Sequence, residues 1–316
     1  MQPLKFNTTY AHPIWGGDAI SEARGLEHDA ERNNGEAFDV TMHPDVCVTI
    51  ANGPLAGMRL DEAVRTHHEE IIGDLPENDI IQVTFMDARE TLSVQVHPNE
   101  EQAQRLDGDH EKSESWYILH AEPGATLIAG SLTDDVDALR AAAADDTIGD
   151  RYGRHVEMHD GDFIVIPAGT MHALGAGMFA VEVGSFGNRT YRICDWGRGR
   201  ELHVEKAFEV LDTSSKPGVN HLGSFDPANG TREREGVSCS TFVSNVADVA
   251  GEYHVEMDGI YHIVTCVEGI CTVETADGAV ELGYTESTLV PASAGAYTVR
   301  GTCRVLQSYR PDSCRK

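Results

Sequence analysis

The chain has 316 residues, of which 41% are hydrophobic and 24% charged, so it can form one large domain or two modest ones with a buried core. No apolar run reaches the roughly 18 residues of a membrane-spanning helix, which excludes an ordinary transmembrane segment. The 24 Lys and Arg residues stand against 52 Asp and Glu residues, and the resulting net charge of −28 argues against binding to nucleic acid or to a membrane.

The charge excess has two explanations, a solubilising acidic surface or adaptation to salt, and we favour the first. The chain does not begin with a basic stretch followed by an apolar run, so no secretory signal is expected. Seven cysteines are an odd number scattered through a long chain, which indicates reduced thiols and not a disulfide framework. We therefore expect a cytoplasmic protein.

Strand patterns dominate the chain and are separated by turns rich in Gly, Pro, Asn and Asp. Strands are predicted at residues 38–50, 80–96, 116–128, 162–167, 178–183, 238–243, 261–267, 271–275, 287–291 and 302–308. Helical periodicity predicts three helices, at residues 59–73, 135–144 and 204–211. The pattern is typical of a mainly β sandwich or jelly roll with a few helices inserted in its N-terminal half.

A connector rich in Ser, Gly, Asn and charged residues covers residues 212–235. We place the domain boundary at its end, which gives an N-terminal domain of residues 1–235 and an all-β domain of residues 236–316. The segments 160–174 and 284–299 resemble each other, since each has an apolar strand that leads into Pro-Ala. Two duplicated β-barrels would produce such an echo.

The first copy of that echo carries the sharpest local motif. Gly161, Pro167, Gly169 and His172 have the spacing of the second motif of the cupin superfamily. The Pro-Ala-Gly turn would point His172 into a barrel interior. A lone histidine in such a place is more often a hydrogen-bonded core residue than a metal ligand, so further ligands are needed to support a metal site.

Candidate ligands lie upstream of His172. Ser93, Gln95 and His97 alternate along a strand, so period-2 geometry puts them on one face. Burial of three polar side chains costs free energy unless a partner satisfies them. Glu114 follows just before another apolar run. Two histidines, a carboxylate and an amide suit a catalytic Zn²⁺ with an open position, although Fe²⁺, Mn²⁺ or Co²⁺ would also fit.

With these motifs in view, the sequence resembles the class I mannose-6-phosphate isomerases (phosphomannose isomerases) of the cupin superfamily, in their short bacterial form. The resemblance runs nearly from end to end. It is carried by the segments 12–17, 52–57, 92–97, 112–114, 167–172, 191–198 and 200–203. It implies two cupin-type jelly-roll β-barrel domains, the first of which is catalytic and binds metal.

The resemblance also implies roles for individual residues. The metal ligands would be Gln95, His97, Glu114 and His172. Arg192 matches the catalytic arginine of the family, which would stabilise a cis-enediolate. Without the other motifs, the simpler interpretation of Arg192 would be a surface ion pair. Ser93, Lys112 and Arg198 match family positions near the site, and Lys112 and Arg198 are favoured to neutralise the phosphate, although a lysine beside several acids is more often a solvated ion pair. Glu182 matches an active-site glutamate, with pairing to Arg192 as its alternative, and the base that transfers the proton stays open.

Two departures from the family pattern lie close to the expected site. Thr84 stands where the family usually has a lysine, and Asn188 replaces an acidic residue four positions before Arg192. Both leave the metal ligands intact and put the substrate in doubt. In the second domain, Ala296 stands where the echo would place a histidine, so we expect this domain to hold no metal and to be structural or a lid.

The leading hypothesis is therefore a zinc-dependent isomerase that interconverts mannose 6-phosphate and fructose 6-phosphate. A non-catalytic or altered-substrate sugar-phosphate binding paralogue is the alternative, and an Fe²⁺-dependent cupin oxygenase a more distant one. The expected partner is a small sugar phosphate, with no nucleic acid and no membrane, and the chain is expected to be a monomer or weak homodimer.

Overall fold

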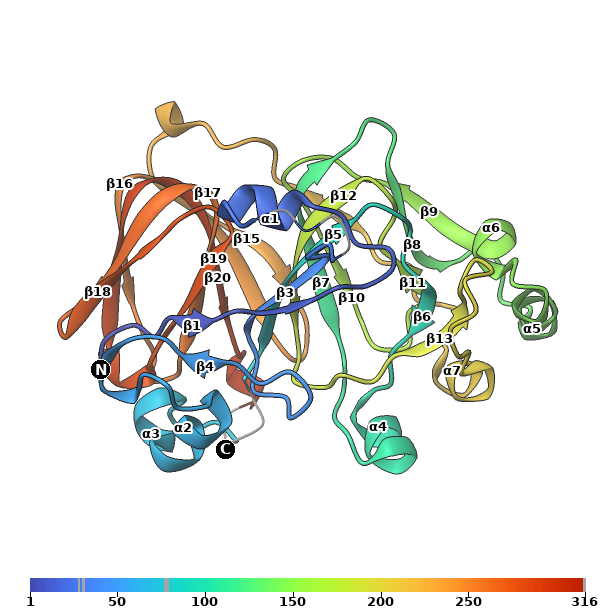
Figure 1. Cartoon of the computed structure of the whole chain (residues 1–316), viewed down its shortest axis with the longest axis horizontal. Coiled ribbons are helices and arrows are strands. Elements are labelled where there is room, and N and C mark those ends of the chain that lie inside the picture. Colours follow the sequence, from blue (N-terminus) through green and yellow to red (C-terminus); the bar gives the residue numbers. More distant parts are fainter. Residues whose placement is uncertain (28, 30–31, 77–79, 315–316) are drawn as a thin grey trace.

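The computed structural model describes residues 1–27, 29, 32–76 and 80–314, and strands are its dominant element (Figure 1). The N-terminal half has a seven-stranded and a five-stranded antiparallel sheet. The seven-stranded sheet has the order β14 (Val219–His221), β10 (Asp162–Ile166), β7 (Glu114–Ala121), β12 (Met178–Gly184), β5 (Gln82–Ala88), β3 (Glu36–Val40), β2 (Thr9–Ala11). The five-stranded sheet has the order β13 (Tyr191–Cys194), β6 (Val94–Val96), β11 (His172–Ala173), β8 (Thr126–Ser131), β9 (Gly153–Glu157).

The inner faces of these two sheets enclose an apolar core. Trp116 of β7 and Ile164 of β10 belong to the same buried cluster as Leu127 and Ala129 of the opposite sheet. Alternation along β6 gives its outer face to a second cluster, in which Val94 and Val96 contact the helices. These helices are α5 (Val136–Ala144), α6 (Ile148–Tyr152) and α7 (Val204–Val210). The intervening residue, Gln95, consequently faces the space between the sheets.

The C-terminal half is a separate sheet of long strands. Its order is β15 (Arg232–Ser238), β16 (Val243–Glu256), β20 (Ala296–Tyr309), β17 (His262–Thr275), β18 (Gly278–Leu282), with β19 (Glu286–Val290) also paired to β17. The two strands predicted at 261–267 and 271–275 are one strand, β17, with an irregularity between Cys266 and Glu268. The prediction of a strand at 238–243 was wrong, because these residues turn the chain from β15 into β16.

The two halves share one apolar cluster. The backbone amide of Leu4 donates to Leu289 at 2.8 Å, and that of Leu289 donates back at 3.0 Å. Leu4 and Leu289 are both buried in a cluster with side chains such as Val83 and Phe85 from the N-terminal half. Close to Leu4 along the chain, β1 (Phe6–Asn7) and β4 (Thr49–Ile50) form a separate two-stranded sheet. The division at residue 235 stays a prediction, and β15 runs across it.

Helices are few and short. The predicted helix at 59–73 forms as α2 (Leu60–Thr66) and α3 (His68–Ile71), and those at 135–144 and 204–211 form as α5 and α7. The helices α1 (Ala19–Arg24), α4 (Glu100–Asp107) and α6 were not predicted. Short 3-10 turns complete the fold at Gly53–Leu55, Pro227–Asn229, Ala292–Ala294 and Asp312–Cys314. In the described part of the chain, no helix is long and apolar enough to cross a membrane.

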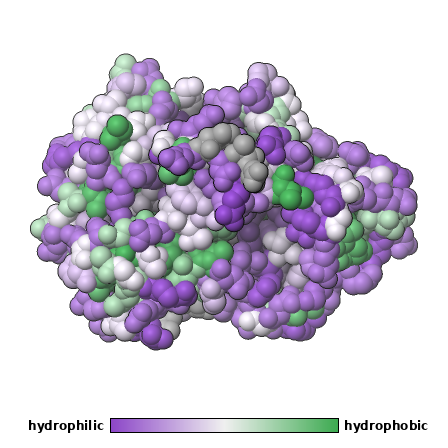
Figure 2. All heavy atoms as spheres, viewed as in Figure 1, coloured by the Kyte–Doolittle hydropathy of each residue, from purple (hydrophilic) through white to green (hydrophobic). Residues whose placement is uncertain are grey.

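The surface agrees with the composition. Figure 2 shows a face on which hydrophilic residues predominate and apolar ones form scattered spots. All seven cysteines are free thiols, and four of them (Cys194, Cys266, Cys271, Cys303) are buried.

Candidate metal centre

Three side chains with metal-binding atoms meet between the two N-terminal sheets. His97 follows β6, Glu114 begins β7 and His172 begins β11, and all three are buried. The Nε2 atoms of His97 and His172 lie 3.1 Å and 3.3 Å from the Glu114 carboxylate. They lie 3.2 Å from each other, and the ligand atoms of the three residues are all within 4.8 Å. The fold thus brings together three of the four ligands expected from the sequence.

Both imidazole rings are oriented by backbone carbonyls. The Nδ1 of His97 lies 2.9 Å from the carbonyl oxygen of Arg189, and that of His172 lies 2.8 Å from the carbonyl oxygen of Thr170. Because a carbonyl oxygen only accepts hydrogen bonds, we assign the ring proton to Nδ1 in each histidine. Each Nε2 then directs a lone pair at the other two ligands, which is the tautomer that a metal ion needs.

Gln95 is placed by strand register. It lies opposite His172 on one neighbouring strand and opposite Arg192 on the other. Residues that pair in this way point to the same face of a sheet. Arg192, Gln95 and His172 therefore form a row across β13, β6 and β11, with the predicted fourth ligand in the middle.

The Glu114 carboxylate fits a bound cation. Both of its oxygens are buried, and neither receives a well-aligned hydrogen bond from a described residue, although Lys112 Nζ lies 3.1 Å from Oε2. Burial by itself would raise the pKa of Glu114, but Lys112 and the two imidazoles hold it well below its ordinary value. Unfilled carboxylate and imidazole lone pairs that converge in a buried space are costly unless a metal occupies it. The donor set, which is N, N and O with an amide nearby, suits Zn²⁺.

The imidazole of His97 is neutral over the physiological range. Burial and then the charge of Lys112 lower the pKa of His97 to about 4. A ring that stays unprotonated keeps its Nε2 lone pair for a metal.

Lys112 connects the metal ligands to Glu182. Its Nζ lies 3.1 Å from Glu114 and 3.3 Å from Oε1 of Glu182. Burial would lower the pKa of Lys112, but Glu182 and Glu114 outweigh this effect and raise it. Burial and the charge of Glu114 raise the pKa of Glu182, and Lys112 opposes them. The partner of Glu182 is therefore Lys112 and not Arg192, and Trp116 Nε1 donates to its other oxygen at 3.4 Å.

A cavity of about 310 Å³ is lined by Gln95 and Lys112, which neighbour the candidate ligands, whereas His97, Glu114 and His172 are not among its described lining residues. Five of the sequence-predicted site residues line it, namely Ser93, Gln95, Lys112, Glu182 and Arg192. The two departures from the family pattern, Thr84 and Asn188, also line it. Thr84 lies directly opposite Glu182 on the neighbouring strand. Arg198 is not among the described residues that line this cavity. Its Nε donates to the carbonyl of Asp195, and its Nη1 lies 3.7 Å from Glu90.

Arg192 presents an incompletely satisfied guanidinium to the cavity. Its Nη1 donates to the carbonyl oxygen of Glu201 at 2.7 Å, whereas its Nε is buried without a described hydrogen-bond partner. Burial and then the charge of Arg200 lower the pKa of Arg192. The group remains charged, because an arginine titrates far above neutrality, and it is suited to receive an anionic oxygen.

Two further ionisable residues, Glu36 and Arg200, line the cavity, and sequence reasoning did not single them out. Burial and the charge of Glu182 raise the pKa of Glu36 to about 7. Arg200 is held by Asp195, whose Oδ1 lies 2.6 Å from Arg200 Nη2. A signal for Glu36 was available, since β3 reads Glu-Ala-Phe-Asp-Val and two acids in so short a strand are unusual. Arg200 lies in a loop and carries no such pattern.

Comparisons with known proteins were made for the whole chain. The family model described as "Phosphomannose isomerase type I, catalytic domain" matches residues 3–129, and "Mannose-6-phosphate isomerase, cupin domain" matches residues 233–310. The mannose-6-phosphate isomerase of Streptococcus mutans is 29% identical over 318 residues, which is 98% of both chains. The mannose-6-phosphate isomerase ManA of Bacillus subtilis is 27% identical over 316 residues, which is 98% of this chain and 99% of that one.

Solved structures that resemble this chain are also mannose 6-phosphate isomerases. The mannose 6-phosphate isomerase of Bacillus subtilis superposes with a TM-score of 0.87 at 25% identity and covers 98% of this chain and 100% of its own. A zinc-bound mannose 6-phosphate isomerase superposes with a TM-score of 0.76 at 15% identity, over 98% and 99% of the two chains, and shows the shared fold. The prediction of a mainly β chain with cupin domains is confirmed.

Proposed function

Because the chain belongs to the type I phosphomannose isomerase family, we propose that it interconverts mannose 6-phosphate and fructose 6-phosphate. The observation that carries the proposal is the meeting of two rows of side chains in one cavity. Arg192 and Gln95 line the cavity in a row that continues to His172 on the same sheet, and Glu182 and Lys112 line the cavity as an ion pair. This arrangement provides a metal site, a fixed cation and a carboxylate within reach of one small ligand.

The reaction moves one proton from C2 to C1 of the sugar and another from O2 to O1, which shifts the carbonyl from C1 to C2. We propose that Glu182 takes the proton from C2 of the open-chain aldose and returns it to C1. Lys112 holds this carboxylate in place, and the raised pKa of Glu182 makes it a better base than an exposed glutamate. The negative charge that develops on the cis-enediolate would be stabilised by the Arg192 guanidinium, whose Nε has no described partner.

A divalent cation held by Gln95, His97, Glu114 and His172 would supply positive charge to the sugar oxygens. We propose zinc, supported by the donor set and by the zinc in a structure of the same fold. Fe²⁺, Mn²⁺ and Co²⁺ are outcomes that a metal analysis would distinguish.

The phosphate needs its own contacts. We propose Ser93, which is buried and lines the cavity, together with the positive charge of Lys112. Arg198, proposed from the family pattern, would reach the phosphate only from outside the described lining. Arg200 lines the cavity and is an additional candidate, because a guanidinium can bind a phosphate through two hydrogen bonds. The atoms that would bind metal and substrate all come from one chain, so the proposed site needs no residue from a second copy.

The test is a coupled assay of mannose 6-phosphate turnover with and without a chelator, beside Arg192→Ala. We expect turnover that the chelator abolishes and that the variant lowers by on the order of a hundredfold or more. A zinc-loaded wild-type protein that binds mannose 6-phosphate without turning it over would contradict the proposal. That result would favour a sugar-phosphate binding paralogue, which the cavity positions of Thr84 and Asn188 keep as the second candidate.

A further inference from the structure

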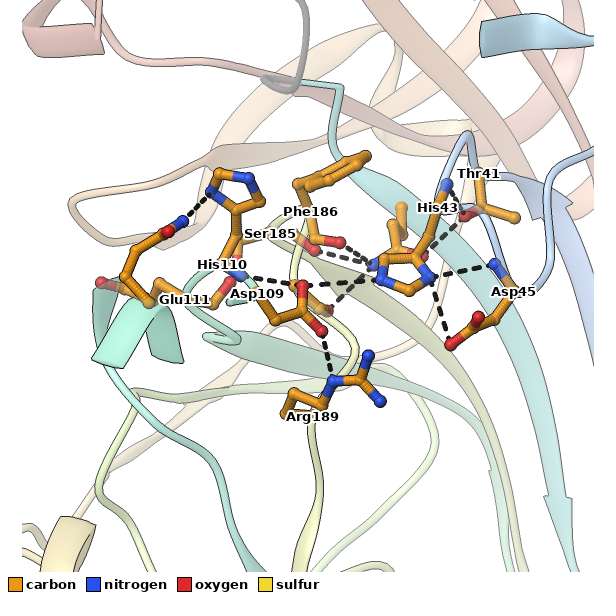
Figure 3. A network of polar contacts seen from close by, with 12 residues as sticks. Thr41, His43, Asp45, Asp109, His110, Glu111, Ser185, Phe186 and Arg189 are labelled. Atoms are coloured by element: carbon orange, nitrogen blue, oxygen red, sulfur yellow. Dashed lines mark hydrogen bonds and ion pairs between the residues drawn. The ribbon is translucent and has the colours of Figure 1, made fainter. Parts of the chain in front are cut away.

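The turn that ends α4 carries two aspartates, Asp107 and Asp109, whose side chains contact residues 189–192 of the proposed active site. Asn99 begins α4 with a capping box, and Gly108, with a φ of 63°, ends it in the left-handed conformation that glycine adopts freely. Asp107 and Asp109 flank this glycine. Tyr191 donates its hydroxyl to Asp107 at 2.5 Å, and Arg189 Nε lies 2.7 Å from Asp109 (Figure 3 shows the second contact).

Residues 189–192 contact one proposed metal ligand, His97, and include the proposed catalytic residue Arg192. The carbonyl oxygen of Arg189 accepts the hydrogen bond from His97 Nδ1. Tyr191 pairs with Val96, and the next residue, Arg192, pairs with Gln95. A displacement at 189 would therefore rotate a metal ligand, whereas a displacement at 191 would move the guanidinium of Arg192.

Asp109 is held from the opposite side by a buried histidine. The Nε2 of His43 lies 3.5 Å from Asp109 Oδ1, and His43 and Asp109 are 4% and 5% exposed. In Figure 3 the Asp109 carboxylate lies between His43 and Arg189. The adjoining loop is fixed by the Gln82 side chain, whose amide donates to the carbonyls of residues 185–187. Arg189 is thus attached between a rigid loop and a buried carboxylate.

Asp107 is also held on both oxygens. Lys206 Nζ of α7 lies 2.6 Å from Oδ1, while Tyr191 occupies Oδ2. The hydroxyl of Tyr191 is therefore fixed between two helices, α4 and α7, that pack outside the five-stranded sheet.

We propose that Asp109 and Asp107 are positioning residues with separate tasks. Asp109 acts through Arg189 to orient His97 for metal binding, and Asp107 acts through Tyr191 to orient Arg192 for the isomerisation. The inference about Asp107 rests on the proposed function, and the inference about Asp109 rests only on the metal site.

The experiment compares Asp109→Asn with Asp107→Asn in metal affinity and in turnover. Zn²⁺ affinity is measured on the metal-free protein by competition with a chromophoric chelator. Asp109→Asn should lower it by on the order of 10- to 100-fold, the usual cost of losing support for a ligating histidine. With saturating zinc, its kcat should stay within about threefold of wild type. Asp107→Asn should keep its zinc affinity and lose on the order of tenfold or more in kcat, with KM little changed.

Three controls separate positioning from general damage. Asp137→Asn, an exposed change of the same kind in α5, should alter neither quantity. Arg189→Ala should reproduce the zinc phenotype, and combining it with Asp109→Asn should add little to either single loss. Tyr191→Phe should reproduce the kcat phenotype, which covers the case that Asp107→Asn does not fold. The Nδ1 proton of His97 in NMR spectra of the metal-free protein should exchange faster in Asp109→Asn.

Equal losses of zinc affinity and kcat in both variants would overturn the proposal, because they would show a merely structural role for the turn. So would wild-type behaviour in both. If no variant and no wild type isomerises the substrate, the proposed function fails, and the zinc and NMR measurements still decide the task of Asp109.

Discussion

Glu182 and Glu36 are two carboxyl groups of one cavity, and substitution can tell which of them moves the proton. Glu182→Gln keeps the shape of the side chain and removes the base. We expect kcat to fall by on the order of 10²- to 10⁴-fold, the usual share of general acid–base catalysis. Zinc content should not change, because Glu182 is not among the proposed ligands. A kcat within threefold of wild type would assign the proton to another group, and the same assay on Glu36→Gln would show whether that group is Glu36.

Glu36 also predicts a pH dependence of stability in the metal-free protein. Its pKa rises from 4.5 to about 7 because it is buried and faces Glu182. The folded protein binds this proton more tightly than the unfolded chain, so the contribution is complete below about pH 4.5 and is lost as the pH rises through 7. Although Glu36 has densely packed surroundings, its side chain keeps some exposed surface, so the loss should be discounted to the order of 1–3 kcal/mol.

Urea unfolding at pH 5 and pH 8 measures this effect. Glu36→Gln has no carboxyl to ionise. The unfolding free energy of the variant minus that of wild type should therefore be larger at pH 8 than at pH 5. An equal difference between variant and wild type at both values would show that Glu36 titrates normally.

Residue chemistry explains which parts of the site could be predicted. Period-2 alternation placed Gln95 on the inner face, and the structure puts Val94 and Val96 on the outer one. The contact of Lys112 with Glu182 was not predicted, because these residues are distant in sequence and meet only through the pairing of β7 with β12. The sequence also did not predict the row formed by Arg192, Gln95 and His172. The reason is the same, since β13, β6 and β11 are neighbours in the sheet but not along the chain.

At the scale of elements, strands were easier to predict than helices. Alternation and Gly or Pro turns marked most strands. Helix α4 was not predicted, because Ala103 is its only buried residue and no apolar stripe repeats along it. Its available signal was the capping box of Asn99 and Gln102. Hydrophobic periodicity therefore finds helices that cover a core and overlooks one that mainly positions loops.

The segment before β1 should stabilise the contact between the two halves. Leu4 is 2% exposed and belongs to the shared cluster. Leu4→Ala would leave a cavity there, and we expect it to cost about 2–5 kcal/mol of unfolding free energy, the usual cost of this change in a packed core. Denaturant unfolding measures the loss. Leu132→Ala is a matched control, because Leu132 is 64% exposed, and it should change stability by less than about 0.5 kcal/mol. Equal effects of the two changes would show that the cluster is not tightly packed at Leu4.

At the scale of the whole molecule, the net charge of −28 should make stability depend on salt. Like charges on the surface repel each other in the compact state, and salt screens that repulsion. Raising NaCl from about 0.05 to 0.5 M, where the Debye length shortens severalfold, should raise the Tm by a few degrees. Differential scanning calorimetry would show it. An unchanged or lower Tm would mean that favourable ion pairs balance the repulsion.

The bridge between Leu4 and Leu289 also orders events during synthesis. Leu4 leaves the ribosome long before Leu289 does. The proposed metal ligands have all been made sooner, once His172 has emerged. The first half can therefore assemble its ligands while the apolar side chains around Leu4 still lack a partner surface. Closure of the shared cluster therefore waits until Leu289 has emerged, and until then the exposed apolar side chains favour aggregation of the nascent chain.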